Sequence, residues 1–132
     1  FIIQAPTGWV LDNSSGINQG LHAVFYPKGG SWEKSPVVMY TNGIDIDSSE
    51  TLNSFIEGDK TKFRNNYSGI KIEEIDPIII SEGARQARII RFYGGAYKFF
   101  EAVAYIKESK NISIFAISSE DEDGFKNNYF CR

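Results

Sequence analysis

Residues 87–118 read ARIIRFYGGAYKFFEAVAYIKESKNISIFAIS, and this stretch decides the fold. Apolar and polar side chains alternate through much of it, which is the pattern of β-strands. Gly94-Gly95 and the polar segment 108–111 interrupt the alternation, and a pair of glycines can adopt the positive φ angles of a two-residue hairpin turn. We therefore predict three antiparallel strands over residues 87–93, 96–107 and 112–118.

The middle strand of this meander is apolar on both of its faces. One face carries Phe100, Ala102, Ala104 and Ile106. The other face carries Tyr97, Phe99, Val103 and Tyr105. Because a strand with two apolar faces must be covered on both sides of its sheet, we expect helices on both faces.

Two segments have the features of helices. The first begins near residue 47, where Asp47 and Glu50 have the spacing of a capping box, and apolar residues at helical spacing continue to Phe63. The second follows Ser119 and Glu122, which have the same spacing and lie in an acidic segment suited to a helix start. We predict a helix over residues 48–66 and a second helix that closes the chain.

The remaining elements are short strands. We predict them over residues 9–11, 21–26, 37–41 and 70–75, with the last interrupted by Pro77 before residues 78–80. The whole chain, residues 1–132, is then one α+β domain. It forms an α/β/α sandwich with an antiparallel sheet of about six or seven strands and helices on both faces.

Composition excludes several classes of protein. The chain has 132 residues, of which 42% are hydrophobic and 14% aromatic, enough to form a core without metals or disulfides. A net charge of −3 and a pI of about 5.2 argue against binding to nucleic acid. No apolar run is long enough to predict a membrane-spanning segment. The chain begins at Phe1, which fits an exported protein whose leader was removed, so we expect a periplasmic or secreted location.

The order of these elements resembles the PsbP-like family. Pro6-Thr7-Gly8-Trp9 leads into short strands, an amphipathic helix follows, and the meander precedes an acid-capped closing helix. That family includes the extrinsic PsbP proteins of photosystem II, the bacterial lipoprotein DcrB and eukaryotic factors that bind the Ran GTPase. The resemblance implies a small, non-enzymatic binding or assembly protein, exported in the bacterial members, whose partner is another protein.

The residue types that support catalysis are scarce. His22 is the single histidine and Cys131 the single cysteine, which excludes zinc motifs built on two histidines or on several cysteines. His22 is a weak candidate metal ligand, with a carboxylate such as that of Asp12. Cys131 is the next-to-last residue of the sequence, a poor position for a nucleophile. We therefore predict no enzyme activity and no cofactor, and a metal-dependent hydrolase is the least supported alternative.

Two groups of residues are candidates for binding. Trp32, Glu33 and Lys34 lie in a glycine-rich loop, where tryptophan suits a binding hot spot, although Trp32 can instead fold over the sheet edge as a lid. Arg91 follows Arg85 and Arg88 on one strand, where the three either bind an acidic partner or balance the acids at 73, 74 and 82 along an edge strand. The supply of aromatic residues also permits a lipid or small-ligand carrier with a cavity between sheet and helix.

Overall fold

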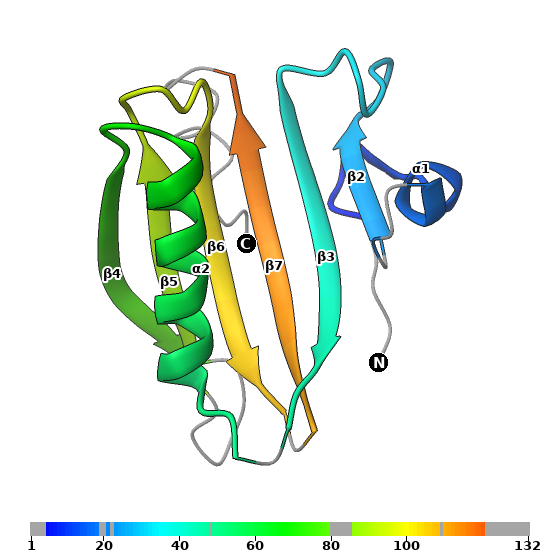
Figure 1. Cartoon of the computed structure of the whole chain (residues 1–132). Coiled ribbons are helices and arrows are strands. Elements are labelled where there is room, and N and C mark those ends of the chain that lie inside the picture. The colour runs from blue at the N-terminus through cyan, green and yellow to red at the C-terminus, as the bar shows by residue number, and fades with distance from the viewer. Residues whose placement is uncertain are drawn as a thin grey trace.

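The structure is a computed structural model that describes residues 5–18, 21, 23–47, 49–79, 86–108 and 110–120. Its elements, in chain order, are β1 (Trp9–Leu11), α1 (Asn13–Asn18), β2 (Ala23–Pro27), β3 (Val37–Asp45), α2 (Leu52–Asn66), β4 (Lys71–Ile79), β5 (Gln86–Tyr93), β6 (Phe100–Lys107) and β7 (Asn111–Ser119). The seven strands form one antiparallel sheet in the order β1-β2-β3-β7-β6-β5-β4 (Figure 1). The predicted α+β class and single antiparallel sheet are confirmed.

The sheet is joined at its centre by strands from the two halves of the chain. β3 pairs with β7 along its full length, from Val37 opposite Ser119 to Asp45 opposite Asn111. The meander β5–β6–β7 is confirmed, with each strand beside the next. The N-terminal strands therefore join the sheet through β7.

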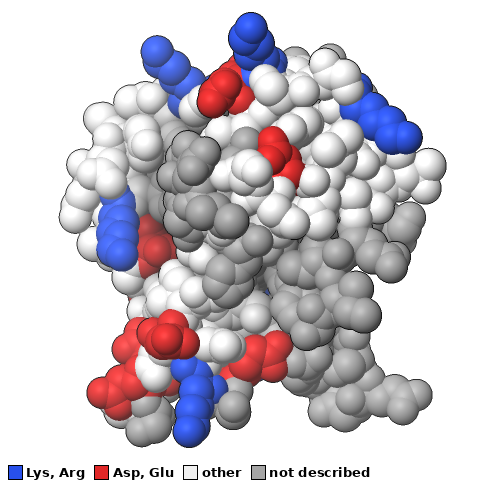
Figure 2. Space-filling view, turned by 90° about the vertical axis from the view of Figure 1, so that its right-hand side faces the viewer, with Lys and Arg blue, Asp and Glu red and all other residues white. Residues whose placement is uncertain are grey.

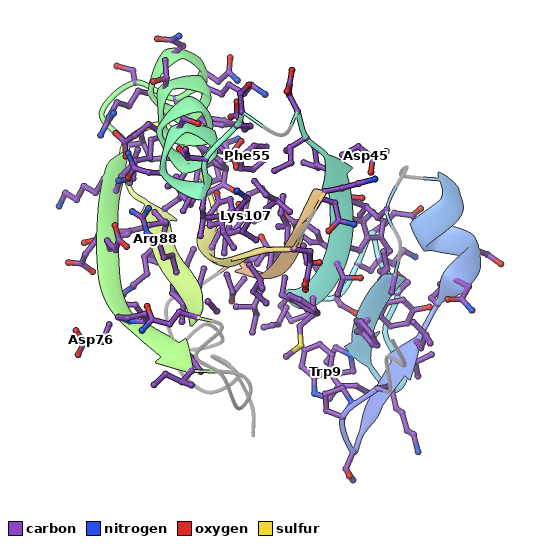
Figure 3. The ribbon with its side chains drawn as sticks, turned by 90° about the horizontal axis from the view of Figure 1, so that it is seen from below. Trp9, Asp45, Phe55, Asp76, Arg88 and Lys107 are labelled. Atoms are coloured by element: carbon purple, nitrogen blue, oxygen red, sulfur yellow. The ribbon has the colours of Figure 1, made fainter. Side chains whose placement is uncertain are left out.

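Helix α2 covers one face of the sheet over β4, β5 and β6 (Figures 1 and 3). Phe55 lies between α2 and the sheet, with its ring 6.1 Å from that of Tyr105. Phe63 stacks on Phe92 with 4.0 Å between ring centroids. The hydroxyl of the fully buried Tyr105 donates a hydrogen bond to Oδ2 of Asp59 at 2.7 Å. Helix α2 is therefore held on the sheet by a hydrogen bond as well as by apolar packing.

The predicted start of this helix is wrong by about one turn. Thr51 is the N-cap, and it forms a capping box with Ser54 in which each side chain accepts a hydrogen bond from the other's backbone N–H. Asp47 and Glu50 instead form a turn ahead of the helix, in which the Glu50 N–H donates to the Asp47 carbonyl at 2.9 Å. Two pairs with capping potential lie in succession, and the second one, which adjoins Leu52, caps the helix.

The two-residue hairpin predicted at Gly94-Gly95 is also wrong. Both glycines have positive φ, 81° and 57°, but β6 begins only after the loop 94–99. The reason is a contact with another part of the chain, because the Ala96 N–H donates to the carbonyl of Ser68 at 2.8 Å. The segment after the glycines is thereby bound to the loop that follows α2, and it does not continue the ladder with β5.

Three smaller differences concern the ends of the sheet. Pro77 does not split β4, because the strand continues past it with a register shift between Ile75 and Ile78, and an edge strand tolerates such a bulge. The segment after Asp12, for which no element was predicted, forms the short helix α1, which packs against β2. The strand predicted from residue 21 begins at Ala23.

The face opposite α2 is apolar and buried as well. Ala102, Ala104 and Ile106 are each less than 10% exposed, and Trp9 and Phe100 pack on this side. Within the described residues, no helix packs on this face. The predicted closing helix falls mostly on residues 121–132, outside the described residues, and its predicted N-cap Ser119 is the last residue of β7. Helices on both faces therefore remain a prediction.

Candidate functional site

A pocket of about 360 Å³ opens at the end of the sheet where α2 and β7 end and β3 and β6 begin, at the top of Figure 1. Aromatic side chains dominate its wall and two glutamates accompany them. We call it the aromatic pocket, and the described residues that line it are Trp32, Glu33, Ser35, Pro36, Val38, Tyr40, Tyr67, Tyr97, Phe99, Ser118 and Glu120.

The loop between β2 and β3 forms the first wall and is held in one shape by its serines. The Ser31 N–H donates to Oγ of Ser35 at 3.0 Å, and the Ser35 N–H donates to the Ser31 carbonyl at 2.9 Å. The Lys34 N–H donates to Oγ of Ser31 at 3.1 Å. A Cβ at Gly30 would lie 2.0 Å from Oγ of Ser35, so glycine permits this close approach. The loop therefore presents Trp32 from a compact turn.

Trp32 lies against the sheet and at the pocket. Its ring packs edge-on against Tyr40 with 6.1 Å between centroids, and it also lines the pocket. Tyr40 belongs to β3, an internal strand, so Trp32 does not cover an edge of the sheet. The Glu120 N–H donates to the Pro36 carbonyl at 2.8 Å, which ties this loop to the end of β7.

Two loops beside the C-terminus of α2 form the second wall. A Cβ at Gly95 would lie 2.4 Å from the carbonyl oxygen of Ser68, so the two backbones touch there. This contact sets Tyr97 beside Tyr67, with 4.6 Å between ring centroids. Phe99 packs edge-on against Tyr97 at 5.8 Å and is 42% exposed. The wall is thus a row of contacting rings with an open end.

A buried carboxylate holds the tyrosines of both walls. Glu101 on β6 is 4% exposed and accepts hydrogen bonds from the hydroxyls of Tyr40 and Tyr97, the latter at 2.5 Å. Burial raises the pKa of Glu101, and the two hydroxyl donors act in the opposite direction. Burial and the Glu101 carboxylate raise the pKa of both phenols, which therefore stay protonated. Both hydroxyl hydrogens point to Glu101, which leaves their oxygens as acceptors for other groups.

Of the residues that the sequence singled out in the glycine-rich loop, the structure places Trp32 and Glu33 at the pocket. Lys34 is exposed on the same loop but does not line the pocket. A binding role for these three residues stays a prediction.

Arg91 lies apart from this group. It pairs in register with Ala102, whose side chain is on the face opposite α2, and it forms an ion pair with Glu73 at 3.0 Å. Arg88 is on the α2 side, where it donates two hydrogen bonds to Glu74, each 2.8 Å. The predicted pairing with acidic residues is thus seen for Arg88 and for Arg91. The predicted edge position is wrong, because β4 lies outside β5, and Arg85 is outside the described residues.

The candidates for metal binding and nucleophilic chemistry remain predictions. His22 and Cys131 lie outside the described residues. Asp12, suggested as a companion ligand for His22, accepts a hydrogen bond from the Tyr26 hydroxyl at 2.5 Å. In the described part of the chain, no three His, Cys, Asp or Glu side chains are grouped so that they could hold a metal ion. Neither described helix has the length and apolar character needed to cross a membrane.

Sequence reasoning gave no binding role to several residues of this site, among them Tyr40, Tyr67, Tyr97, Phe99 and Glu101. It assigned Tyr40, Tyr97 and Phe99 only to strands. One signal was present, because Glu101 is a charged residue within the apolar run 99–106. A carboxylate in such a strand must be buried with partners, and the tyrosines nearby are suitable donors.

Comparisons with known proteins agree with the fold. No protein-family model matches the chain, and no curated protein matches its sequence. Among solved structures, the chain is similar to the solution structure of cyanobacterial PsbP (CyanoP) from Synechocystis sp. PCC 6803, with a TM-score of 0.57 and 16% sequence identity. The similarity covers 92% of this chain and 75% of that one. The chain has a PsbP-like fold, and the resemblance inferred from the order of its elements is confirmed.

Proposed function

We propose that this protein binds another protein through the end of the sheet that holds the aromatic pocket, and that it carries out no chemistry of its own. The observation that carries the proposal is the pocket itself, walled by Trp32, three tyrosines and the 42% exposed Phe99. Tryptophan and tyrosine dominate the binding energy of protein interfaces, and exposed aromatic clusters commonly mark them.

The chemistry of the pocket supports binding over catalysis. Its described lining contains two serines and two exposed glutamates, but no histidine, cysteine or lysine. A serine nucleophile needs a base within hydrogen-bond reach, and histidine or lysine usually supplies it. The buried Glu101 accepts hydrogen bonds from the hydroxyls of Tyr40 and Tyr97 and thereby fixes the positions of these side chains.

The surface charge supports a protein partner over nucleic acid. Figure 2 shows the molecule from the side of β1 and β2, where the surface is mainly uncharged, acidic residues gather toward the lower end and basic residues form no broad patch. The net charge of −3 also disfavours binding to nucleic acid. We place the protein in the periplasm or outside the cell, an assignment supported by its PsbP-like fold.

A small-ligand carrier is the second candidate, because a volume of about 360 Å³ falls within the range of small-molecule sites. The pocket lies at the end of the sheet beyond α2, whereas the space between α2 and the sheet is filled by contacts such as that of Phe63 with Phe92. The position favours a compact ligand over a long lipid chain.

Photo-crosslinking in the native cell tests the proposal. The Phe99→p-benzoylphenylalanine variant places a photoreactive ring at the open end of the pocket. We expect one discrete protein adduct, which Trp32→Ala weakens. The matched control is the same substitution at Lys62, which is exposed on α2 away from the pocket lining, and it should give no such adduct. Absence of an adduct from position 99, or the same adduct from both positions, contradicts the proposal.

A further inference from the structure

The walls of the aromatic pocket are suited to a cation. Rings of Trp32, Tyr40, Tyr67 and Tyr97 contribute to one small enclosure. The π-faces of tryptophan and tyrosine carry partial negative charge, and they attract an ammonium or guanidinium group within about 6 Å of the ring centroid. An apolar ligand would also pack against such rings. The charged groups of the pocket therefore determine whether a cation or an apolar ligand fits better.

The charged groups favour a cation as well. Glu33 and Glu120 both line the pocket, both are exposed, and neither forms an ion pair with a described residue. Among the described lining residues there is no lysine or arginine. Lys34 and Lys98 adjoin lining residues in the chain, but their own side chains do not line the pocket. Within the described residues, the pocket therefore offers negative charge without a counter-ion of its own.

The hydrogen bonds of the tyrosines disfavour an anion. Tyr40 and Tyr97 donate their hydroxyl hydrogens to the buried Glu101. An anion would need those donors, whereas a lysine or arginine brings its own and can use the phenol oxygens and the two carboxylates as acceptors. The same bonds restrain both rings before any ligand arrives, which reduces the entropy lost on binding.

We propose that the aromatic pocket receives the charged side chain of a lysine or arginine that projects from the partner protein. This inference rests on the proposed function and adds the chemistry of its recognition. A volume of about 360 Å³ accommodates one long side chain, and the aromatic walls contact its methylene groups. The side chain enters from the open end beside Phe99 and lies between Trp32 and the tyrosines.

Titration of the purified full chain with three capped amino acids, followed by amide NMR, tests the inference. Nα-acetyl-lysine methylamide and Nα-acetyl-arginine methylamide carry the cation. Nα-acetyl-norleucine methylamide has a similar chain without the charge. We expect saturable shifts at the Trp32 indole and the amides of residues 32–36 and 97–99 with the two cations, and none with norleucine. Equal shifts with norleucine, or no saturable shift with either cation, overturn the inference.

Charge-neutralising variants make the test specific. Glu33→Gln combined with Glu120→Gln should weaken cation binding by about threefold to tenfold, and Trp32→Ala should abolish it. The matched control is Asp45→Asn combined with Glu50→Gln, which changes net charge equally at the opposite end of β3 and should leave binding unchanged. Equal weakening by both pairs would assign the effect to net charge and overturn the inference.

The two experiments separate this inference from the proposed function. An adduct from position 99 without cation binding supports protein binding and overturns the lysine or arginine assignment. Cation binding without an adduct contradicts the proposed protein partner. The inference then fails as well, because the bound group would be a free organic cation and not a side chain of a partner protein. An adduct whose partner contributes a crosslinked segment without lysine or arginine likewise overturns the inference.

Discussion

Glu101 shows how a single residue organises this site. A carboxyl group on an internal strand loses its hydration, and that loss is expensive unless other groups replace the water. Here the hydroxyls of Tyr40 and Tyr97 replace part of it. The two tyrosines are thereby fixed in place. Burial also raises the pKa of Glu101, so this carboxyl group ionises less readily than an exposed one.

The raised pKa of Glu101 predicts a defined pH dependence of stability. As pH rises through the ordinary range of glutamate, near 4.3, the unfolded chain releases its proton before the native protein does. The free energy of unfolding of the wild type should therefore fall relative to that of Glu101→Gln. Urea denaturation of both proteins at about pH 4 and about pH 7 measures this difference.

A second glutamate serves as the control for this pH effect. Glu57 is exposed, and its hydrogen bond from Lys60 lowers its pKa, so its contribution to stability is present at neutral pH and lost as pH falls. Glu57→Gln should therefore give a small difference of the opposite sign. If the difference for Glu101→Gln does not change with pH, or changes in the same direction as that for Glu57→Gln, the assigned environment of Glu101 is wrong.

Sequence reasoning reached part of the site at the residue scale. Trp32 stood out because a tryptophan in a glycine-rich loop is unusual, and that property can be read locally. Tyr40, Tyr67 and Glu101 come together only after three separate segments have met. No spacing rule links them, so their roles could not be read from the chain.

At the scale of elements, the contact between the loop 94–99 and the loop after α2 leaves no room for a side chain at Gly95. Gly95 has a φ of 57°, and an added Cβ would lie 2.3 Å from the carbonyl carbon of Gly69. We expect Gly95→Ala to lower the free energy of unfolding by about 2 kcal/mol or more, because strain in φ and a backbone clash act together. Thermal or urea denaturation measures the loss.

The same substitution inside α2 provides the control for Gly95→Ala. Gly58 is in the helix, and an added Cβ there meets nothing within 4 Å. Gly58→Ala should raise the free energy of unfolding by about 0.5–1 kcal/mol, since alanine is the better helix former. Losses of equal size at both positions would show that the close approach at Gly95 is not the cause.

The elements that were predicted correctly depend on local pattern. Alternation in residues 112–118 and helical spacing around Phe55 and Phe63 identify a strand and a helix wherever they are placed. The start of the helix was wrong because two pairs with capping potential are adjacent in the chain, whereas the predicted hairpin was wrong because a distant segment binds its backbone. The turn at Gly94-Gly95 failed because Ala96 bonds to Ser68, a contact that pattern alone does not reveal.

At the scale of the whole molecule, the two tryptophans test whether the chain unfolds as one domain. Trp9 packs on the face opposite α2, whereas Trp32 packs against Tyr40 on the other (Figure 3 labels Trp9). Each of the variants Trp9→Phe and Trp32→Phe retains one tryptophan, whose fluorescence reports unfolding on its own side of the sheet. Because β3 and β7 join the sheet into one unit, the fluorescence transition of each variant should coincide with its far-UV circular dichroism transition. Separate transitions within one variant would indicate two units.

The class of fold and the meander β5–β6–β7 could be predicted from the sequence, but the pairing of β3 with β7 could not. Counting alternating segments gave the strands, because each strand shows its own pattern. The neighbours of β3 are β2, which is close in the chain, and β7, which is far away. Pairing between distant strands depends on packing across the whole sheet, for which a single sequence offers no local sign.

The pairing of β3 with β7 has a consequence for synthesis on the ribosome. The first three strands emerge early, but the strand that completes the ladder of β3 emerges last among the described strands. Until then, the growing polypeptide exposes a row of unsatisfied backbone groups that can pair with other nascent chains. The emergence of β7 is therefore the step that allows the described sheet to be completed, and chaperones that bind emerging chains have their longest opportunity before it.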